Sequence, residues 1–290
     1  MKLFGIYSRQ DLDREYSPSS MIPDVERYLR LYEAKSAVAR ARLKGHLDRR
    51  YGRAEDEVLD IFPAATGTAP APVQLFIHGG YWQELSKNEA SASAPDFVAA
   101  GATFVALNYG LAPKYSLDEI VAQARQAVAW LYRNLAKYGG DPERIYVSGH
   151  SAGAQLALML LATDWPGAYD MPAEVIKGVC AVSGVYDMEP VRLTYVNDVL
   201  GLDETAAARN SPLHHIPERA CPLILAVGER ETREFRRQTF DFAKAWRAAG
   251  HRCRLLDLPG LNHFDLILDL GDRGTPLGRA VLEQMNLLPG

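Results

Sequence analysis

The segment GHSAG at residues 149–153 is the part of this sequence most specific for chemistry. It follows a run of β-forming residues at 145–148 and opens an apolar stretch that extends to residue 162. Glycines on both sides of a serine permit a sharp strand-to-helix turn that exposes the hydroxyl. Free N–H groups and the dipole at the start of the helix favour an anion beside that hydroxyl. The pattern therefore predicts that Ser151 is a nucleophile.

A serine hydroxyl needs a base to become nucleophilic, and the base needs a carboxylate to orient it. When the serine lies on a strand-to-helix turn, the acid and then the histidine follow it along the chain. Of the histidines after Ser151, only His263 follows the carboxyl end of a predicted strand, where ligands of open α/β sheets bind. We therefore predict His263 as the base. The others precede that strand or lie in an irregular segment: His214, His215 and His251.

The acid is expected directly after the preceding strand, which we predict at residues 223–227. Three glutamates compete for this position: Glu229, Glu231 and Glu234. Glu234 lies where the next helix begins, and an acid in a first turn often only complements the helix dipole. Spacing alone does not distinguish Glu229 from Glu231.

A second glycine-containing segment, HGGYW at residues 78–82, follows another predicted strand. The tetrahedral intermediate of acyl transfer carries an oxyanion that needs preorganised N–H donors. One donor belongs to the residue after the nucleophile, Ala152, and the others come from a loop of the HGGG type after an earlier strand. Gly79 and Gly80 let the backbone approach the intermediate. We expect the remaining donors at Gly80 and Tyr81.

Strand-like and helix-like segments alternate along the chain from about residue 58 onward. This alternation predicts βαβ units and a mostly parallel central sheet flanked by helices. Predicted strands occupy residues 73–77, 103–107, 145–148, 178–183, 223–227 and 254–258. Predicted helices occupy residues 117–137, 155–162 and 235–249.

Two segments lie outside this alternation. Residues 17–52 predict a helical N-terminal arm with its start near Pro23 and Asp24. Residues 189–217 mix prolines and glycines with polar and apolar side chains, and we expect a cap-like excursion over one edge of the sheet. The sequence has no internal repeat and no low-complexity linker, so we predict one domain over residues 1–290.

The composition argues against several classes of protein. A net charge of -4 and a pI near 6.0 give no electrostatic reason to expect a nucleic-acid partner. The N-terminus lacks the apolar core of a secretory signal, and no stretch approaches the roughly 18 apolar residues of a membrane helix. Three cysteines without paired spacing predict reduced thiols in a cytoplasmic protein. No metal motif such as HExxH occurs, so we expect no metal or other cofactor, and a homodimer is left open.

Four segments taken together resemble the kynurenine formamidase (arylformamidase) branch of the α/β-hydrolases, which is related to hormone-sensitive-lipase-like esterases. They are HGGYW, GHSAG, AVSGVYDMEPV and VGERETREFRRQTFDF. The resemblance extends from about Tyr16, through SPSSMIPDVERYL, to the last helix, and it implies an α/β-hydrolase fold. In that family the acid lies three residues before EF in a run like ExxEFxRQ, which corresponds to Glu231. The resemblance likewise supports Ser151 and His263.

Two positions depart from the family pattern. Gly110, in NYGLAP, stands where relatives usually carry the arginine of YRLAP. Because glycine has no charged side chain, the substitution is expected to remove a structural ion pair. The acid, Glu231, is a glutamate where many relatives have aspartate, a change that a triad tolerates. Neither departure concerns the nucleophile.

The resemblance implies hydrolysis of N-formylkynurenine to formate and kynurenine in tryptophan catabolism. A formyl group needs little room, whereas the aromatic amine needs a flat apolar wall, for which Tyr81, Trp82 and Tyr186 are candidates. Tyr81 also stands where esterase relatives have glycine, so its bulk is expected to narrow the acyl side. The alternative is a carboxylesterase for short-chain acyl esters that uses the same triad. A non-catalytic binding protein on a hydrolase scaffold would have lost its base, and His263 is present.

Overall fold

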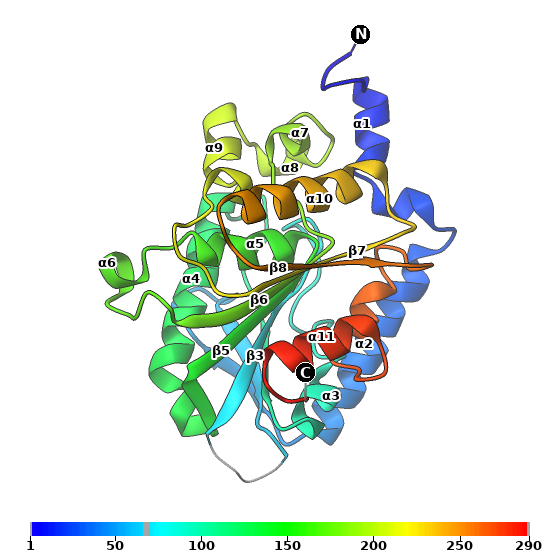
Figure 1. Cartoon of the computed structure of the whole chain (residues 1–290). Coiled ribbons are helices and arrows are strands. Elements are labelled where there is room, and N and C mark those ends of the chain that lie inside the picture. Colours follow the sequence, from blue (N-terminus) through cyan, green and yellow to red (C-terminus); the bar gives the residue numbers. More distant parts are fainter. Residues whose placement is uncertain (1, 66–69, 289–290) are drawn as a thin grey trace.

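An eight-stranded sheet lies at the centre of the computed structural model, which describes residues 2–65 and 70–288 (Figure 1). The strands are β1 (His46–Arg50), β2 (Val58–Phe62), β3 (Ala71–Ile77), β4 (Thr103–Leu107), β5 (Gly140–His150), β6 (Ile176–Val182), β7 (Leu223–Gly228) and β8 (Cys253–Leu258). Their order across the sheet is β1-β2-β4-β3-β5-β6-β7-β8. β2 pairs antiparallel with both of its neighbours, and every other neighbouring pair is parallel. The predicted mostly parallel sheet is confirmed.

Helices cover both faces of the sheet (Figure 1). On one face α4, α5 and α10 share a hydrophobic core with the strands, and on the other face α2, α3 and α11 do so. The α-helices are α1 (Arg9–Glu15), α2 (Val25–Arg42), α3 (Ala94–Ala99), α4 (Leu117–Asn134), α5 (Ala152–Leu161), α6 (Trp165–Tyr169), α7 (Glu189–Arg192), α8 (Asn197–Leu200), α9 (Glu204–Arg209), α10 (Arg233–Ala248) and α11 (Pro276–Gln284). The described residues also form four 3-10 helices: η1 (Pro18–Met21), η2 (Leu135–Tyr138), η3 (Pro212–His214) and η4 (Leu266–Asp269).

The central strand β3 shows how this layering follows from the sequence. Every residue of its segment APVQLFI is buried. Because successive side chains of a strand point to opposite faces, Leu75 joins the core on one face and Phe76 joins the core on the other. A parallel strand that is covered on both faces needs such an uninterrupted run. The parallel strands end along one edge of the sheet, and the loops that leave this edge carry the predicted site residues.

The six predicted strands correspond to β3 through β8, and most of their ends agree within two residues, although β5 starts earlier, at Gly140. The helical prediction for residues 17–52 is wrong for residues 46–50, which form β1. The β1 sequence HLDRR is mostly exposed and charged, as is usual for an edge strand, so it shows no strand-like alternation. Neither β2 nor α1 was predicted.

The N-terminal arm consists of α1, η1 and α2. The Asp24 carboxylate accepts a hydrogen bond from the Arg27 N–H at 3.0 Å and thereby caps α2, in agreement with the predicted start of this helix. At the end of α1, the Tyr16 hydroxyl donates to the Glu234 carboxylate of α10 at 3.1 Å. This bond joins parts of the chain that are 218 residues apart. The arm is therefore attached to the body of the fold.

The segment 189–217 contains α7, α8, α9 and η3, and the three α-helices lie above α10 in Figure 1. It is anchored at its base, because the Gln155 side chain of α5 donates to the Asn210 carbonyl at 2.9 Å. The Met188 N–H donates to the Ser211 hydroxyl at 2.8 Å, which closes the segment into a compact excursion. None of the helices in the described part of the chain has the length and apolar composition that a bilayer crossing requires.

Candidate active site

The turn between β5 and α5 presents Ser151 at the edge of the sheet. Its backbone has φ 55° and ψ -118°, a conformation that costs energy for a residue with a side chain. A Cβ on Gly149 would lie 2.1 Å from the Gly153 carbonyl oxygen. A Cβ on Gly153 would lie 2.1 Å from the Ile77 carbonyl oxygen at the end of β3. Both glycines are therefore required for this turn to form and to pack against the sheet.

His263 lies on the loop that follows β8 and lines the same cleft as Ser151. Its Nδ1–H donates to Glu231 Oε2 at 2.8 Å. Its ring packs against the Phe235 ring at 4.8 Å and the Phe264 ring at 5.2 Å, measured between centroids. Ser151 and His263 are only 4% and 5% exposed, and both line one cleft. The structure therefore brings together the serine, the histidine and the acid that the sequence analysis singled out.

The carboxylate of Glu231 has hydrogen-bond donors on both of its oxygens. Oε2 accepts from His263, while Oε1 accepts from the Gly228 N–H at 2.9 Å and from the Ser183 hydroxyl. A carboxylate with donors on both oxygens is held in one orientation. Glu231 is thus placed to fix the orientation and the tautomer of the His263 ring.

The two competing glutamates have other partners. Glu229 is exposed, and its carboxylate accepts from the Gly260 N–H at 2.7 Å. Glu234 lies in the first turn of α10 and forms an ion pair with Arg237 at 2.7 Å. The contacts therefore select Glu231 over Glu229, where spacing alone left the two equivalent.

The sequence analysis did not identify Ser183 as part of this site. Ser183 follows β6 directly, is fully buried, and has a φ of 50°. A small polar residue immediately after a buried strand, at the edge where the site lies, is the signal that could have indicated it. Its partner Glu231 is 48 residues further along the chain, so local spacing carries no information about the contact.

The loop after β3 lies directly against the turn that holds the nucleophile. A Cβ on Gly79 would lie 2.9 Å from the His150 carbonyl oxygen and 3.0 Å from Ser151 Cβ, so a glycine permits this approach. Gly80 and Tyr81 line the same cleft as Ser151, and their φ values are 96° and 50°. The loop therefore places its backbone beside the hydroxyl of Ser151.

The backbone N–H groups expected to form the oxyanion hole are free. Those of Gly80, Tyr81 and Ala152 have no hydrogen-bond acceptor among the residues that the structure describes. Ala152 is the first residue of α5, where the helix leaves its N–H groups unsatisfied. An oxyanion hole requires free donors of this kind. Gly79 does not line this cleft but lines a neighbouring cavity. Its role is to let the loop approach the turn that holds Ser151.

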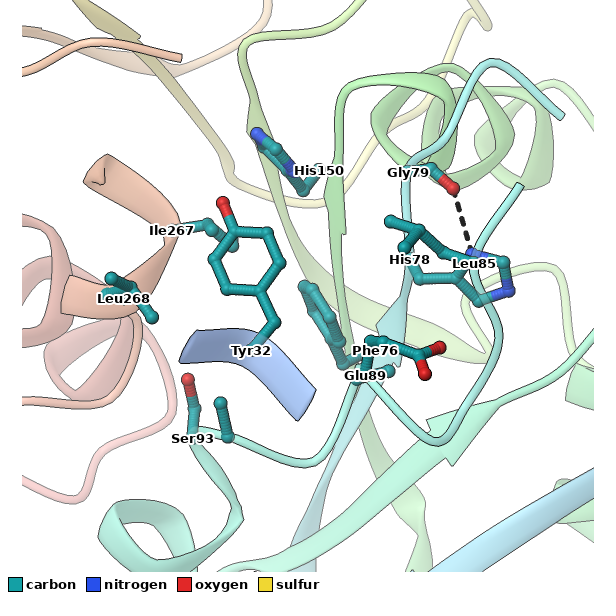
Figure 2. Close-up of a pocket in the computed structure, with 12 residues that line it drawn as sticks. Tyr32, Phe76, His78, Gly79, Leu85, Glu89, Ser93, His150, Ile267 and Leu268 are labelled. Carbon is teal, nitrogen blue, oxygen red and sulfur yellow. Dashed lines mark hydrogen bonds between the residues drawn. The ribbon is translucent and has the colours of Figure 1, made fainter. Parts of the chain in front are cut away.

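Two buried side chains form hydrogen bonds with the backbone of this loop, and Figure 2 shows the bond from His78 to the Gly79 carbonyl. The His78 Nδ1–H donates to the Gly79 carbonyl at 2.8 Å, and the Tyr109 hydroxyl donates to the His78 carbonyl at 2.9 Å. The carbonyl of Gly79 and the N–H of Gly80 belong to one trans peptide, so they point in opposite directions. The bond to His78 therefore turns the Gly80 N–H away from the His78 ring.

The cleft in front of Ser151 has a volume of about 350 Å³, within the range of small-molecule sites. The N-terminal arm covers it with residues of η1 and α2, and the excursion covers it with Tyr195 and Val196. Two residues of segment 189–217, which was predicted to be a cap-like excursion, therefore line the cleft. Aromatic rings from several segments line the cleft: Tyr32, Tyr81, Tyr195 and Phe264.

The expectation that Trp82 and Tyr186 contact the substrate is corrected. Their exposed fractions are 0% and 1%, and neither lines the cleft. The Trp82 indole N–H donates to the Gln155 side chain at 3.1 Å, and the Tyr186 hydroxyl accepts from the Gly184 N–H at 3.1 Å. Both rings pack in the hydrophobic core, where their polar atoms find partners.

The described residues 2–65 and 70–288 contain no group of three or more His, Cys, Asp or Glu side chains that could hold a metal ion.

Burial raises the pKa of the Cys180 and Cys221 thiols to about 12, so both are protonated at neutral pH. Neither thiol is therefore suited to act as a nucleophile.

Acidification is expected to destabilise the protein through its buried histidines. Burial lowers the pKa of His78 to about 4, whereas the unfolded chain titrates near 6.5. The unfolded state therefore binds a proton that the folded state does not, and the free energy of unfolding should fall as the pH falls through this window. The His78 contribution is at most about 1.4 kcal/mol per pH unit.

Denaturant unfolding of wild type and His78→Asn between pH 7.5 and 4.5 measures this effect. Asparagine does not titrate, and its side-chain N–H can still donate to the Gly79 carbonyl. The wild type should lose more stability than the variant on acidification. Parallel curves for the two proteins would contradict the assignment to His78.

Three comparisons with known proteins show what this chain is similar to. The family model described as BD-FAE matches residues 59–244. A curated relative, kynurenine formamidase of Danio rerio, is 36% identical over 96% of this chain and 97% of its own length. Esterase LipC of Mycobacterium tuberculosis is 29% identical over 98% of this chain and 73% of its own length.

A solved structure from Silicibacter sp. TM1040 superposes with a TM-score of 0.81 at 26% identity, and the match covers 93% of this chain and 98% of that chain. The fold therefore agrees over almost the whole length. This chain is a member of the BD-FAE family of α/β-hydrolases, on its kynurenine formamidase branch.

Proposed function

We propose that this protein hydrolyses N-formylkynurenine to formate and kynurenine, with Ser151, His263 and Glu231 as a catalytic triad. The observation that carries the proposal is the His263–Glu231 hydrogen bond beside a serine on a strained strand-to-helix turn. The near full-length similarity to a curated kynurenine formamidase supports the choice of substrate.

In the first half of the reaction, Ser151 Oγ attacks the formyl carbon while His263 Nε2 takes its proton. Glu231 holds the proton of His263 on Nδ1, so Nε2 is free to act as the base. The former carbonyl oxygen becomes an oxyanion, and the N–H groups of Gly80, Tyr81 and Ala152 stabilise it.

Collapse of this intermediate breaks the bond between the formyl carbon and the aromatic nitrogen. The His263 imidazolium returns its proton to that nitrogen, and kynurenine leaves as a neutral aromatic amine. A formyl ester of Ser151 remains. His263 then takes a proton from water, which attacks the ester, and formate leaves as Ser151 Oγ recovers its proton.

A carboxylesterase for short-chain acyl esters is the second candidate, and the similarity to Esterase LipC favours it. The same triad and the same N–H donors serve either reaction, so the choice depends on the walls of the cleft. Tyr81 lines the cleft and lies on the loop that approaches Ser151, so its ring is the candidate wall on the acyl side.

The bulk of Tyr81 is expected to favour the formyl group. Aryl formates and formanilides should react faster than the matching acetates, and butyrates should be slowest. Tyr81→Gly should partly erase this ranking, since its backbone N–H remains while the ring is lost. Glycine also fits the positive φ of this position, so the variant should fold. The measurement is kcat/KM on each acyl series and on N-formylkynurenine.

Tyr81→Phe is the matched control, because it keeps the ring and loses only the hydroxyl that donates to the Tyr16 carbonyl. This variant should keep the wild-type ranking. Faster hydrolysis of butyrates than of formates, with no turnover of N-formylkynurenine, would assign the protein to the esterases instead.

A further inference from the structure

The loop that carries His263 is held by more than the bond to Glu231. That bond orients the imidazole ring, but the backbone of the loop needs its own supports. Two consecutive carbonyls of the loop accept hydrogen bonds from side chains. The His150 Nε2–H donates to the His263 carbonyl at 2.8 Å, and the Tyr32 hydroxyl donates to the Phe264 carbonyl.

His150 connects the base to the nucleophile. It is the last residue of β5 and directly precedes Ser151. It is 6% exposed, and its ring centroid lies 4.7 Å from that of His263. Because a carbonyl can only accept, Nε2 must carry the proton in this contact. The bond therefore links the backbone of His263 to the strand end that presents Ser151.

Tyr32 connects the base to the N-terminal arm. It lies on α2 and is 6% exposed, and Tyr28 lies one turn earlier on the same face of the helix. The Tyr28 hydroxyl accepts from the Asn262 side chain at 3.0 Å, and its ring lies 5.8 Å from the ring of Phe264. The arm therefore contacts the residues on both sides of His263.

The two supports come from different elements, His150 from the end of β5 and Tyr32 from α2. His150 and Tyr32 line the same small cavity, and Figure 2 shows the Tyr32 hydroxyl pointing toward the side on which His150 lies. His150 and Tyr32 belong to elements that are far apart in the sequence. Loss of one contact therefore leaves one of the two adjacent carbonyls without its side-chain donor.

We propose that His150 and Tyr32 are positioning residues that set the distance between His263 and Ser151, so that the docked N-terminal arm completes the active site. The proposal rests on the proposed role of His263 as the base. A displacement of about 1 Å between reacting groups can cost roughly a hundredfold in rate. Two hydrogen bonds to adjacent carbonyls oppose such a displacement directly.

The test compares His150→Leu, His150→Gln and Tyr32→Phe. The glutamine Nε2–H can reach the position of the histidine Nε2–H, whereas leucine of similar size has no donor. Phenylalanine removes only the hydroxyl of Tyr32. His150→Leu and Tyr32→Phe should lower kcat by about ten- to a hundredfold with little change in KM, and His150→Gln should stay within about threefold of the wild type.

A second measurement reports the position of the His263 ring in the absence of substrate. The proton between His263 Nδ1 and Glu231 is expected to give a low-field proton NMR resonance, which should shift or broaden in His150→Leu and in Tyr32→Phe. It should keep its position in His150→Gln. A role confined to stability would leave this resonance unchanged.

Tyr51→Phe is the matched control. Tyr51 is 3% exposed, and its hydroxyl donates to the Asn108 carbonyl at 2.8 Å, so the variant loses the same kind of bond far along the chain from His263. It should keep both kcat and the resonance. The proposal is overturned if His150→Leu and Tyr32→Phe match Tyr51→Phe in kcat and in the spectrum, or if His150→Gln is as impaired as His150→Leu.

The outcome does not depend on which acyl substrate the protein uses. The variants are assayed on whichever substrate the wild type hydrolyses fastest. A wild type that cleaves aryl esters but not N-formylkynurenine overturns the proposed substrate, and the comparison of variants still decides the role of His150 and Tyr32.

Discussion

Ser151→Ala and His263→Ala should each lower kcat by at least about a thousandfold, because the members of a catalytic triad act as a unit. Without the Ser151 hydroxyl no acyl-enzyme can form. Without the His263 imidazole the hydroxyl keeps its proton, and the leaving amine receives none. The remaining rate would come from substrate binding and from the free N–H groups of the oxyanion loop.

Both variants are expected to remain folded. Alanine at position 151 has the same Cβ as serine in the same positive-φ turn, so it adds no backbone strain. Thermal unfolding checks the fold, and a fluorophosphonate probe that reacts with activated serines reports the nucleophile directly. The probe should label the wild type, label His263→Ala slowly and leave Ser151→Ala unlabelled. More than a tenth of wild-type kcat in either variant contradicts the assignment.

The parts of the site that depend on contiguous residues could be predicted from the sequence. The turn around Ser151 needs a strand, two glycines and a helix in succession, and residues 145–162 contain all of them. His263 was identified because it follows a strand at the edge where all parallel strands end. In both cases a local pattern and the topology of a parallel sheet were sufficient.

The parts that depend on contacts between distant residues could not be predicted in this way. The choice of Glu231 over Glu229 depends on which carboxylate faces His263, 32 residues away. Trp82 was expected in the cleft because aromatic residues suit a flat substrate, yet the first turn after β3 directs its ring into the core. Two neighbouring residues, Tyr81 and Trp82, therefore have opposite environments, which sequence spacing does not encode.

The N-terminal arm shows the same limit at a larger scale. Its helix α2 could be predicted from the capping residue Asp24 and the length of the segment. Its position over the cleft could not, because it depends on contacts such as that of Tyr32 with Phe264, which are 232 residues apart. Helical pattern indicates which face is apolar, but not which loop that face will cover.

Glu231→Gln should lower kcat by on the order of a thousand- to ten-thousandfold, whereas Glu229→Gln should stay within about threefold of the wild type. The two substitutions make the same chemical change at positions two residues apart. Glutamine at 231 retains an oxygen for the donors at Gly228 and Ser183, so the fold should tolerate it. The other end of its amide becomes an N–H group that faces His263 Nδ1.

That N–H group cannot accept a hydrogen bond, so it favours the tautomer in which the His263 proton lies on Nε2. The base then has no free lone pair for the proton of Ser151, and no carboxylate stabilises the imidazolium that forms during the reaction. At position 229 the side chain is exposed and only accepts from the Gly260 N–H, which a glutamine oxygen can also do. The measurement is kcat for Glu231→Gln and for Glu229→Gln, and unfolding curves check that the two variants are equally stable. A larger loss of kcat in Glu229→Gln than in Glu231→Gln would assign the acid to Glu229.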